Sequence, residues 1–262
     1  MLLTWKTKFS ATAILLLLLA LPQTATATVV EVDTGLGTVQ INLYDTATPA
    51  TVSNFLNYVN SGAFTDSILH RSIPGFVIQG GGFITDINAQ FSNITTNPAV
   101  ANEPVYSNVR GTISMAKFGD DPNSATSQWF INLANNASNL DVQNGGFTVF
   151  GEVTAGMDII DNIAGLPRYD FGTAFTDLPL QNYSSADFAN NVPVDNTHLV
   201  IVTAVNVIDT TVDSAAGLNP TPTTRNTTPP GNGGGGGGGS FALLSLLGLF
   251  GFAAARVLRH RR

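Results

Sequence analysis

Apolar and polar residues alternate over the first part of the interior of the chain. Residues 29–44, VVEVDTGLGTVQINLY, show this alternation on both sides of a Gly-Leu-Gly turn, which predicts a β-hairpin. Short clusters of apolar and β-branched residues predict further strands. These are expected around residues 68–73, 76–79, 111–115, 128–133 and 147–153, and in the segment HLVIVTAVNVID at 198–209.

Two segments follow a helical period instead. Apolar side chains recur at i, i+3, i+4 and i+7 at Val52, Phe55, Leu56 and Val59. Thr48 is the expected cap, Pro49 suits the first position, and Gly62 follows the end. A second, shorter helix is expected over residues 157–164. Two helices among about eight strands predict a mainly β fold: a closed eight-stranded antiparallel β-barrel capped by two α-helices.

The first 27 residues are typical of a secretory signal peptide. Lys6 and Lys8 precede an apolar run at 11–21, and small residues follow at Ala25-Thr26-Ala27, which predicts cleavage near Ala27. An uncleaved anchor helix is the alternative. Cleavage is favoured because the apolar run is shorter than the roughly 20 residues that span a bilayer.

The other end of the chain carries a second unusual segment. Residues 210–232 are rich in Thr, Pro and Asn and predict a linker, and residues 233–262 hold a glycine run, an apolar stretch at 241–255 and four arginines. Basic residues favour the cytoplasmic side of a membrane, so both ends place residues 28–209 outside the cytoplasm.

The tail at 233–262 resembles the GlyGly-CTERM sorting signal of Gram-negative bacteria. This resemblance implies a rhomboid-type sorting protease as a partner that cuts near the glycines, with membrane association through the tail before processing. It also implies an exported protein of the periplasm or cell surface. A plain tail anchor, which would keep the chain in the membrane, is the alternative.

Charge narrows the function of the middle segment. Six of the 11 basic residues lie in the two end segments, which hold no acidic residue. The remainder has five basic and 18 acidic residues, a net charge of −13. Nucleic-acid binding is therefore not expected, because it needs clustered Lys and Arg. The absence of cysteine excludes disulfides, thiol catalysis and Cys-ligated metals.

The stretch SILHRSIPGFVIQGGGF, at 67–83, concentrates the candidate chemistry. His70 and Arg71 are neighbours in an expected strand and face opposite sides, so they are not expected to act as a pair. With His198 in the last strand and His260 in the tail, hydrolytic triads and histidine-rich metal sites are not supported. The glycines do not make a phosphate loop, since no Gly-Lys-Ser/Thr follows, and they predict close backbone approach.

Five motifs in order resemble the cyclophilin-type peptidyl-prolyl cis–trans isomerases, of the exported bacterial kind. They cover most of residues 29–166: TPATVSNFLNYVNSGAF, HRSIPGFVIQGGGF, GTISMA, SATSQWFINL and FTVFGEVTAGMDIIDNI. The implied activity is isomerisation of X-Pro bonds in polypeptides, without a cofactor, a metal or a covalent intermediate. Such chemistry needs a donor that favours a twisted amide, and arginine supplies a permanently charged one.

The resemblance assigns roles residue by residue. Arg71 matches the catalytic arginine and Gln79 the glutamine that braces it, and Ala116, Lys117 and Gln128 match the substrate groove. The proline pocket is matched by Phe76, Val77, Phe130, Leu140 and Phe147. His70 is expected to be structural, with its ring turned away from the groove and hydrogen-bonded.

Some features depart from the family pattern. Leu69 replaces the usual phenylalanine, and Asn139 replaces the Trp or Phe of the loop that binds cyclosporin, so weak inhibition is expected. The segment at 166–197 is longer than the usual link to the last strand and predicts only a rim or partner-binding loop. A monomer is expected. Two other functions stay open: a non-catalytic module that binds Pro-containing segments, and a permanently membrane-embedded protein.

Overall fold

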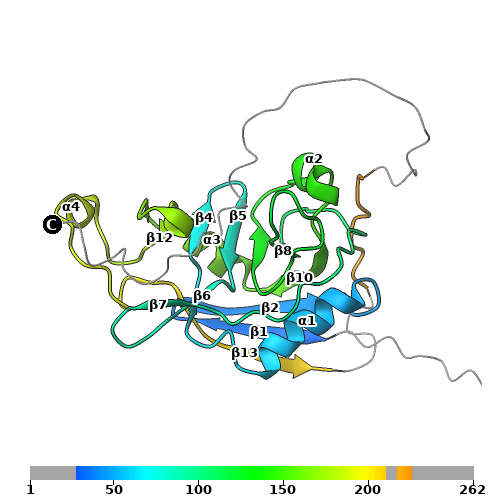
Figure 1. The fold of residues 1–262 in the computed structure, drawn as a ribbon, viewed down its shortest axis with the longest axis horizontal. Helices are drawn as coiled ribbons and strands as arrows, with labels where there is room; N and C mark the ends of the chain where they lie inside the picture. Colours follow the sequence, from blue (N-terminus) through cyan, green and yellow to red (C-terminus); the bar gives the residue numbers. More distant parts are fainter. Residues whose placement is uncertain (1–27, 211–216, 226–262) are drawn as a thin grey trace, which may run out of the picture.

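Residues 28–210 and 217–225 are described by a computed structural model of the chain (Figure 1). Most of the ordered elements are strands. In chain order they are β1 (Val29–Thr34), β2 (Gly37–Leu43), β3 (Ser67–Ile68), β4 (Arg71–Ile73), β5 (Val77–Gly80), β6 (Phe83–Thr85), β7 (Phe91–Asn93), β8 (Thr112–Met115), β9 (Trp129–Asn132), β10 (Val149–Ala155), β11 (Arg168–Tyr169), β12 (Leu178–Pro179) and β13 (Ile201–Asp209). The predicted mainly β class is confirmed.

Eleven of these strands form one antiparallel sheet. Its order is β4-β5-β9-β8-β10-β2-β1-β13-β3-β6-β7, and β11 and β12 pair separately. The predicted hairpin is confirmed as β1 and β2, which stay in register from Val29 opposite Asn42 to Thr34 opposite Gly37. On its other edge β1 pairs with β13, so the last strand of the sheet lies beside the first.

The sheet curls because one short segment takes part in two distant regions of it. Leu69 and His70 separate β3, which pairs with β13, from β4, which pairs with β5. The Leu69 amide donates to the Val200 carbonyl at 3.0 Å, and the His70 amide donates to the Gln79 carbonyl at 3.1 Å. The expected closed barrel of eight strands is not confirmed, since this segment counts as two strands and β6 and β7 add two more.

The two predicted helices are confirmed as α1 (Pro49–Asn60) and α3 (Met157–Ala164). Thr48 is the N-cap of α1, but its side chain makes no cap hydrogen bond. The carboxylate of Glu103 accepts instead from the amides of Ala50 and Thr51, at 3.3 and 2.9 Å. The sequence did not predict the short helices α2 (Ala137–Leu140) and α4 (Ser185–Ala189) or the 3₁₀ turns Gln143–Gly145 and Thr173–Phe175.

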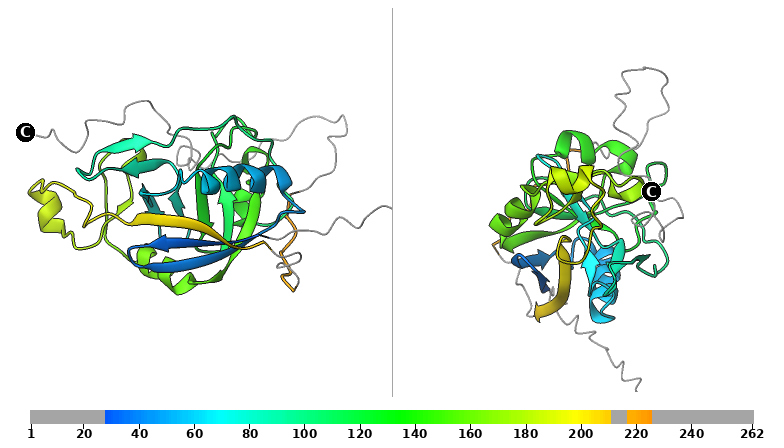
Figure 2. Two further views of the ribbon diagram at one scale, coloured as in Figure 1. Left: turned by 90° about the horizontal axis from the view of Figure 1, so that it is seen from below. Right: turned by 90° about the vertical axis from the view of Figure 1, so that its left-hand side faces the viewer.

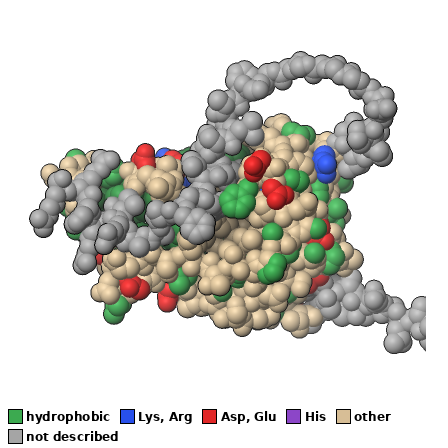
Figure 3. Space-filling view, viewed as in Figure 1, with side chains coloured by type: hydrophobic (Ala, Val, Ile, Leu, Met, Phe, Trp, Pro, Cys, Tyr) green, Lys and Arg blue, Asp and Glu red, His purple; other side chains and the backbone are tan. Residues whose placement is uncertain are grey.

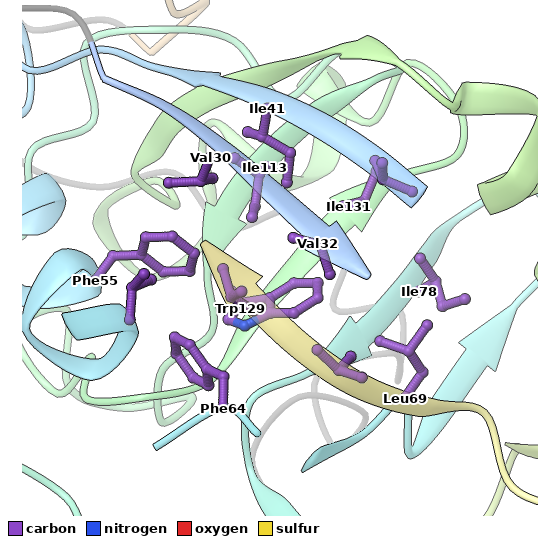
Figure 4. Packing of buried hydrophobic residues seen from close by; sticks show 14 of the residues in the cluster. Val30, Val32, Ile41, Phe55, Phe64, Leu69, Ile78, Ile113, Trp129 and Ile131 are labelled. Atoms are coloured by element: carbon purple, nitrogen blue, oxygen red, sulfur yellow. The ribbon is translucent and has the colours of Figure 1, made fainter. Parts of the chain in front are cut away.

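The main core lies between α1 and the inner face of the curled sheet. Figure 4 shows Phe55 of α1, Phe64 and Trp129 of β9 directed toward this shared interior, and each is at most 2 % exposed. Figure 2 shows α1 beside β13. Burial of this face of α1 explains the helical spacing of apolar residues at 52–59 in the sequence.

A second, smaller core belongs to the long segment at 166–197. Phe175, Leu178, Leu180 and Tyr183 from this segment pack with Ile68 and other residues of the sheet. Figure 1 shows α4 and β12 toward the same end of the molecule. The segment is therefore an ordered, packed insertion.

Part of the expected linker also packs on the domain. The Ser107 amide donates to the Thr221 carbonyl at 2.8 Å, and the Thr223 amide donates to the Val105 carbonyl at 3.1 Å. The Asp141 carboxylate accepts from the Thr224 amide at 3.0 Å. The predicted signal peptide at 1–27 and the sorting tail at 233–262 lie outside the described residues. Of the helices in the described ranges, none has the length and apolar character to cross a membrane.

Candidate active site

Three buried polar side chains from three strand regions form a hydrogen-bonded chain. Nη1 of Arg71 in β4 donates to Oε1 of Gln79 in β5 at 3.3 Å. Nε2 of Gln79 donates in turn to Oε1 of Gln128, just before β9, at 2.8 Å. The three side chains are at most 8 % exposed. The structure thus brings together Arg71 and Gln79, which the resemblance assigned to catalysis, and Gln128, which it assigned to the substrate groove.

These contacts engage only one of the three guanidinium nitrogens of Arg71. Nη2 is buried and has no hydrogen-bond partner among the described residues. Nε lies 4.0 Å from Oδ2 of Asp177. Burial lowers the pKa of Arg71 below its ordinary value, and the Asp177 carboxylate opposes that shift. Arginine keeps its charge across the physiological range, so Nη2 is a charged donor in a dry site.

Six apolar residues of the predicted site form a cluster of their own, separate from the main core. Its buried members are Val77, Ala116, Phe130, Leu140 and Phe147, and Phe76 packs against them. Phe130 and Phe147 meet edge to face, with ring centroids 5.9 Å apart. Phe130 lies opposite Gln79 in the β5–β9 pair, so the apolar cluster adjoins the polar chain.

An asparagine that sequence reasoning did not select, Asn136, holds the backbone of Phe76. The Phe76 carbonyl accepts from the Leu133 amide at 2.8 Å and from Nδ2 of Asn136 at 2.9 Å. Nδ2 of Asn136 also donates to Oδ1 of Asn132 at 2.8 Å. The density of asparagine in INLANN, at 131–136, was the available signal, because buried amides need internal partners.

Ala116 and Lys117 lie just beyond the end of β8. The Ala116 amide donates to the Gln128 carbonyl at 2.9 Å. Lys117 is 2 % exposed, and its Nζ donates to the Asn144 carbonyl at 2.7 Å and lies 4.8 Å from the centroid of Phe147. Burial, helped by the charge of Arg225, lowers the pKa of Lys117 to about 8. The side chain of Lys117 therefore holds the loop that carries Phe147.

The glycines of QGGGF leave space for the polar chain. A Cβ on Gly82 would lie 2.7 Å from Nε2 of Gln128. Gly81 has φ +74°, and a Cβ there would lie 2.6 Å from the Ser127 carbonyl oxygen. Glycine is thus needed at position 82 because a side chain would displace the Gln128 amide. It is needed at position 81 because the backbone is left-handed there and lies against the Ser127 carbonyl.

His70 lies outside the hydrogen-bonded chain. Its ring is edge-on to Phe83, with centroids 5.0 Å apart, and it belongs to the side of the sheet covered by the insertion. Burial, with a smaller effect of the Arg71 charge, lowers the pKa of His70 to about 3, while a hydrogen bond to the Ile68 backbone opposes the shift. Nδ1 has no partner among the described residues. His70 is accordingly neutral at physiological pH.

No group of three His, Asp or Glu side chains in the described part of the chain could hold a metal ion. On the face drawn in Figure 3, acidic side chains are scattered and basic ones are few. The polar chain of the Arg71 guanidinium and the Gln79 and Gln128 amides thus lies beside a buried apolar cluster.

Comparison with known proteins identifies relatives over this same region. The family described as cyclophilin type peptidyl-prolyl cis-trans isomerase/CLD matches residues 29–183. Peptidyl-prolyl cis-trans isomerase A of Dickeya dadantii is 43% identical over 58% of this chain and 76% of its own length. Peptidyl-prolyl cis-trans isomerase B of Escherichia coli is 40% identical over 51% of this chain and 82% of its own length.

A solved structure shows the same fold. The crystal structure of a Cryptosporidium parvum cyclophilin type peptidyl-prolyl cis-trans isomerase aligns with a TM-score of 0.50 at 21% identity. The alignment covers 71% of this chain and 99% of the other. At this identity the similarity concerns the fold alone.

Proposed function

The chain belongs to the cyclophilin-type peptidyl-prolyl cis–trans isomerases, and from this premise we propose that Arg71 is its catalytic residue and that it acts on X-Pro bonds of exported or surface proteins, assisting their folding. One observation carries the assignment. Nη2 of Arg71 is buried and has no partner among the described residues, its side chain is anchored through Gln79, and Gln79 lies opposite Phe130 of the apolar cluster.

The reaction needs no broken bond. Amide resonance sets a rotation barrier of about 18–20 kcal/mol, and uncatalysed X-Pro isomerisation takes tens of seconds or more. In the twisted amide the prolyl nitrogen is pyramidal and more basic. A guanidinium N–H aimed at that nitrogen, or at the preceding carbonyl, binds the twisted amide more strongly than the planar one. Each 1.4 kcal/mol of this preference contributes about tenfold in rate.

The apolar cluster supplies the position of the proline. A pyrrolidine ring bound at Phe76, Val77, Phe130, Leu140 and Phe147 would be removed from water. Nη2 of Arg71 is already buried. The Arg71–Gln79–Gln128 chain holds that donor before substrate arrives, so the preorganisation does not have to be made during the reaction. No cofactor or metal enters this mechanism.

A direct test compares the purified full-length chain with Arg71→Ala. Isomerisation of a proline tetrapeptide is followed by exchange between the cis and trans signals in NMR spectra, and we expect accelerated exchange with the wild type only. Equal, uncatalysed rates for both proteins would overturn the catalytic proposal. Chemical-shift changes on X-Pro peptide addition without accelerated exchange would favour the non-catalytic binding module.

Cellular location belongs to the same proposal. The signal-peptide pattern at 1–27 and the GlyGly-CTERM-like tail at 233–262 support export, membrane association before processing and cleavage by a rhomboid-type protease. Mass spectrometry of the protein from cells would read both mature ends. A chain that keeps its tail in the inner membrane would favour permanent anchoring.

Inhibitor response and oligomeric state complete the proposal. Asn139 in α2 stands where tightly cyclosporin-binding relatives carry tryptophan, so we expect weak inhibition by cyclosporin. We also propose that the protein acts as a monomer. Titration with cyclosporin and sedimentation of the purified chain would measure each property.

A further inference from the structure

The insertion at 166–197 brings a carboxylate to Arg71 that the sequence did not connect with the site. The Ser72 amide donates to the Asp177 carbonyl at 2.9 Å. The backbone of Asp177 is therefore hydrogen-bonded to β4 at the residue that follows Arg71. Oδ2 of Asp177 lies 4.0 Å from Nε of Arg71. Asp177 is the only residue of the described ranges whose carboxylate forms an ion pair with Arg71.

The position of Asp177 is set by the packing of its neighbours. Phe175, two residues earlier, is 7 % exposed and stacks on Phe91 with ring centroids 5.0 Å apart. Leu178, the next residue, is 1 % exposed in the same cluster. The Phe171 amide donates to the Phe175 carbonyl at 3.0 Å. Buried side chains on both sides of Asp177 thus fix the backbone from which its carboxylate projects.

The contacts of the guanidinium leave one nitrogen for other use. Nη1 donates to Gln79, Nε faces Asp177, and Nη2 has no partner among the described residues. A planar guanidinium held at Nη1 alone could still turn about its long side chain. A carboxylate near Nε opposes that movement and leaves Nη2 as the donor directed away from both contacts.

We propose that Asp177 is a positioning residue for Arg71, and that the insertion at 166–197 is part of the catalytic apparatus. This inference rests on the proposed function, because it concerns the orientation of the same arginine. The Asp177 side chain is 36 % exposed and its distance from Nε is 4.0 Å, so it acts through charge attraction moderated by water. We therefore expect a moderate effect on rate.

The test uses the full-length chain with Asp177→Asn, which keeps the shape of the side chain and removes its charge. Asp170→Asn in the same insertion is the matched control: Oδ1 of Asp170 accepts from the Gly172 amide, and asparagine can still accept there. We expect Asp177→Asn to lower kcat/KM about fivefold, mainly through kcat, and Asp170→Asn to leave it unchanged. The Arg71 Nε–Hε resonance in NMR spectra should shift with the first variant only.

A double-mutant cycle separates positioning from a general structural effect. In the Arg71→Ala background, Asp177→Asn should cause no further loss, because the residue that it positions is absent. Wild-type kcat and an unmoved Arg71 resonance in Asp177→Asn would overturn the inference, as would an equal loss in both backgrounds. If the wild type itself does not accelerate isomerisation, the proposed function fails instead.

Discussion

Arg71 and Gln79 lie directly opposite each other in the β4–β5 pair, and Nη1 of the arginine donates to Oε1 of the glutamine at 3.3 Å. On its other edge the same glutamine lies opposite Phe130 of β9. One residue of a central strand therefore joins the cation to the apolar cluster that contains Phe130. Strand pairing, which fixes the backbone on both sides, makes this relationship rigid.

Replacing Gln79 with leucine should reduce activity and stability together. The change leaves Nη1 of Arg71 and Oε1 of Gln128 buried without this partner, which costs about 1–3 kcal/mol of stability for each unsatisfied group. We expect kcat/KM to fall at least about tenfold, since each 1.4 kcal/mol of lost transition-state binding is tenfold. Gln40→Leu on β2, which does not neighbour β4 or β5, is the control; equal kinetics for the two variants would contradict the bracing role.

Replacing Gly82 with alanine should lower activity more than stability. The new Cβ would lie 2.7 Å from Nε2 of Gln128, and the end of that flexible side chain can move away at small cost. Its movement breaks the hydrogen bond from Gln79. We expect kcat/KM to fall several-fold with a change in unfolding free energy of about 1 kcal/mol or less. Gly35→Ala, with no atom within 4 Å of the new Cβ, should change neither quantity.

Trp129 and Phe130 are adjacent in β9 but belong to different clusters, so their substitutions should separate stability from activity. Trp129 packs in the main core, and Phe130 packs in the separate apolar cluster with Val77 and Phe147. Each change to leucine should cost about 1–3 kcal/mol in denaturant unfolding. Only Phe130→Leu should also lower kcat/KM of the folded protein. A matching kinetic loss in Trp129→Leu would show that the pocket is not the specific site.

His70 should make the protein sensitive to acid. Burial, with a contribution from the Arg71 charge, lowers its pKa to about 3, whereas the unfolded chain binds this proton near pH 6.5. The unfolded state thus holds more protons between these values, and stability falls as pH drops through this window, by up to ~1.4 kcal/mol per pH unit. Urea unfolding at several pH values should show that the unfolding free energy of His70→Leu falls less steeply with decreasing pH than that of the wild type. Identical slopes for the two proteins would mean that His70 is not held neutral.

Glu103 should stabilise α1 without affecting catalysis. Its carboxylate accepts from the amides of Ala50 and Thr51 at the positive end of the helix dipole. We expect Glu103→Ala to reduce the unfolding free energy by about 1–2 kcal/mol, as for the loss of a cap. Glu31→Ala, on the sheet away from the helix terminus, should cost less. Isomerase activity of the folded Glu103 variant should match that of the wild type.

Periodic features of the sequence carried most of the fold prediction. The alternation at 29–44 and the helical spacing at 52–59 predicted β1, β2 and α1, because burial of one face leaves a regular pattern. The number of strands was wrong, since strands of two or three residues such as β3 and β7 are too short to show a period. Thr48 was predicted as the N-cap residue, but the side chain that accepts from the first amides of α1 was missed, because Glu103 is 52 residues from Thr51.

The sequence by itself determined the kind of chemistry: one arginine among apolar residues, no cysteine, and motifs whose residues the structure gathers at one site. The tertiary structure alone decided how that arginine is held. Asp177 lies 106 positions after Arg71 and belongs to none of the five motifs. Its position comes from the packing of the insertion against the sheet. Local patterns record which face of an element is buried. Contacts between distant segments depend on how the buried faces fit together, and no periodicity records that fit.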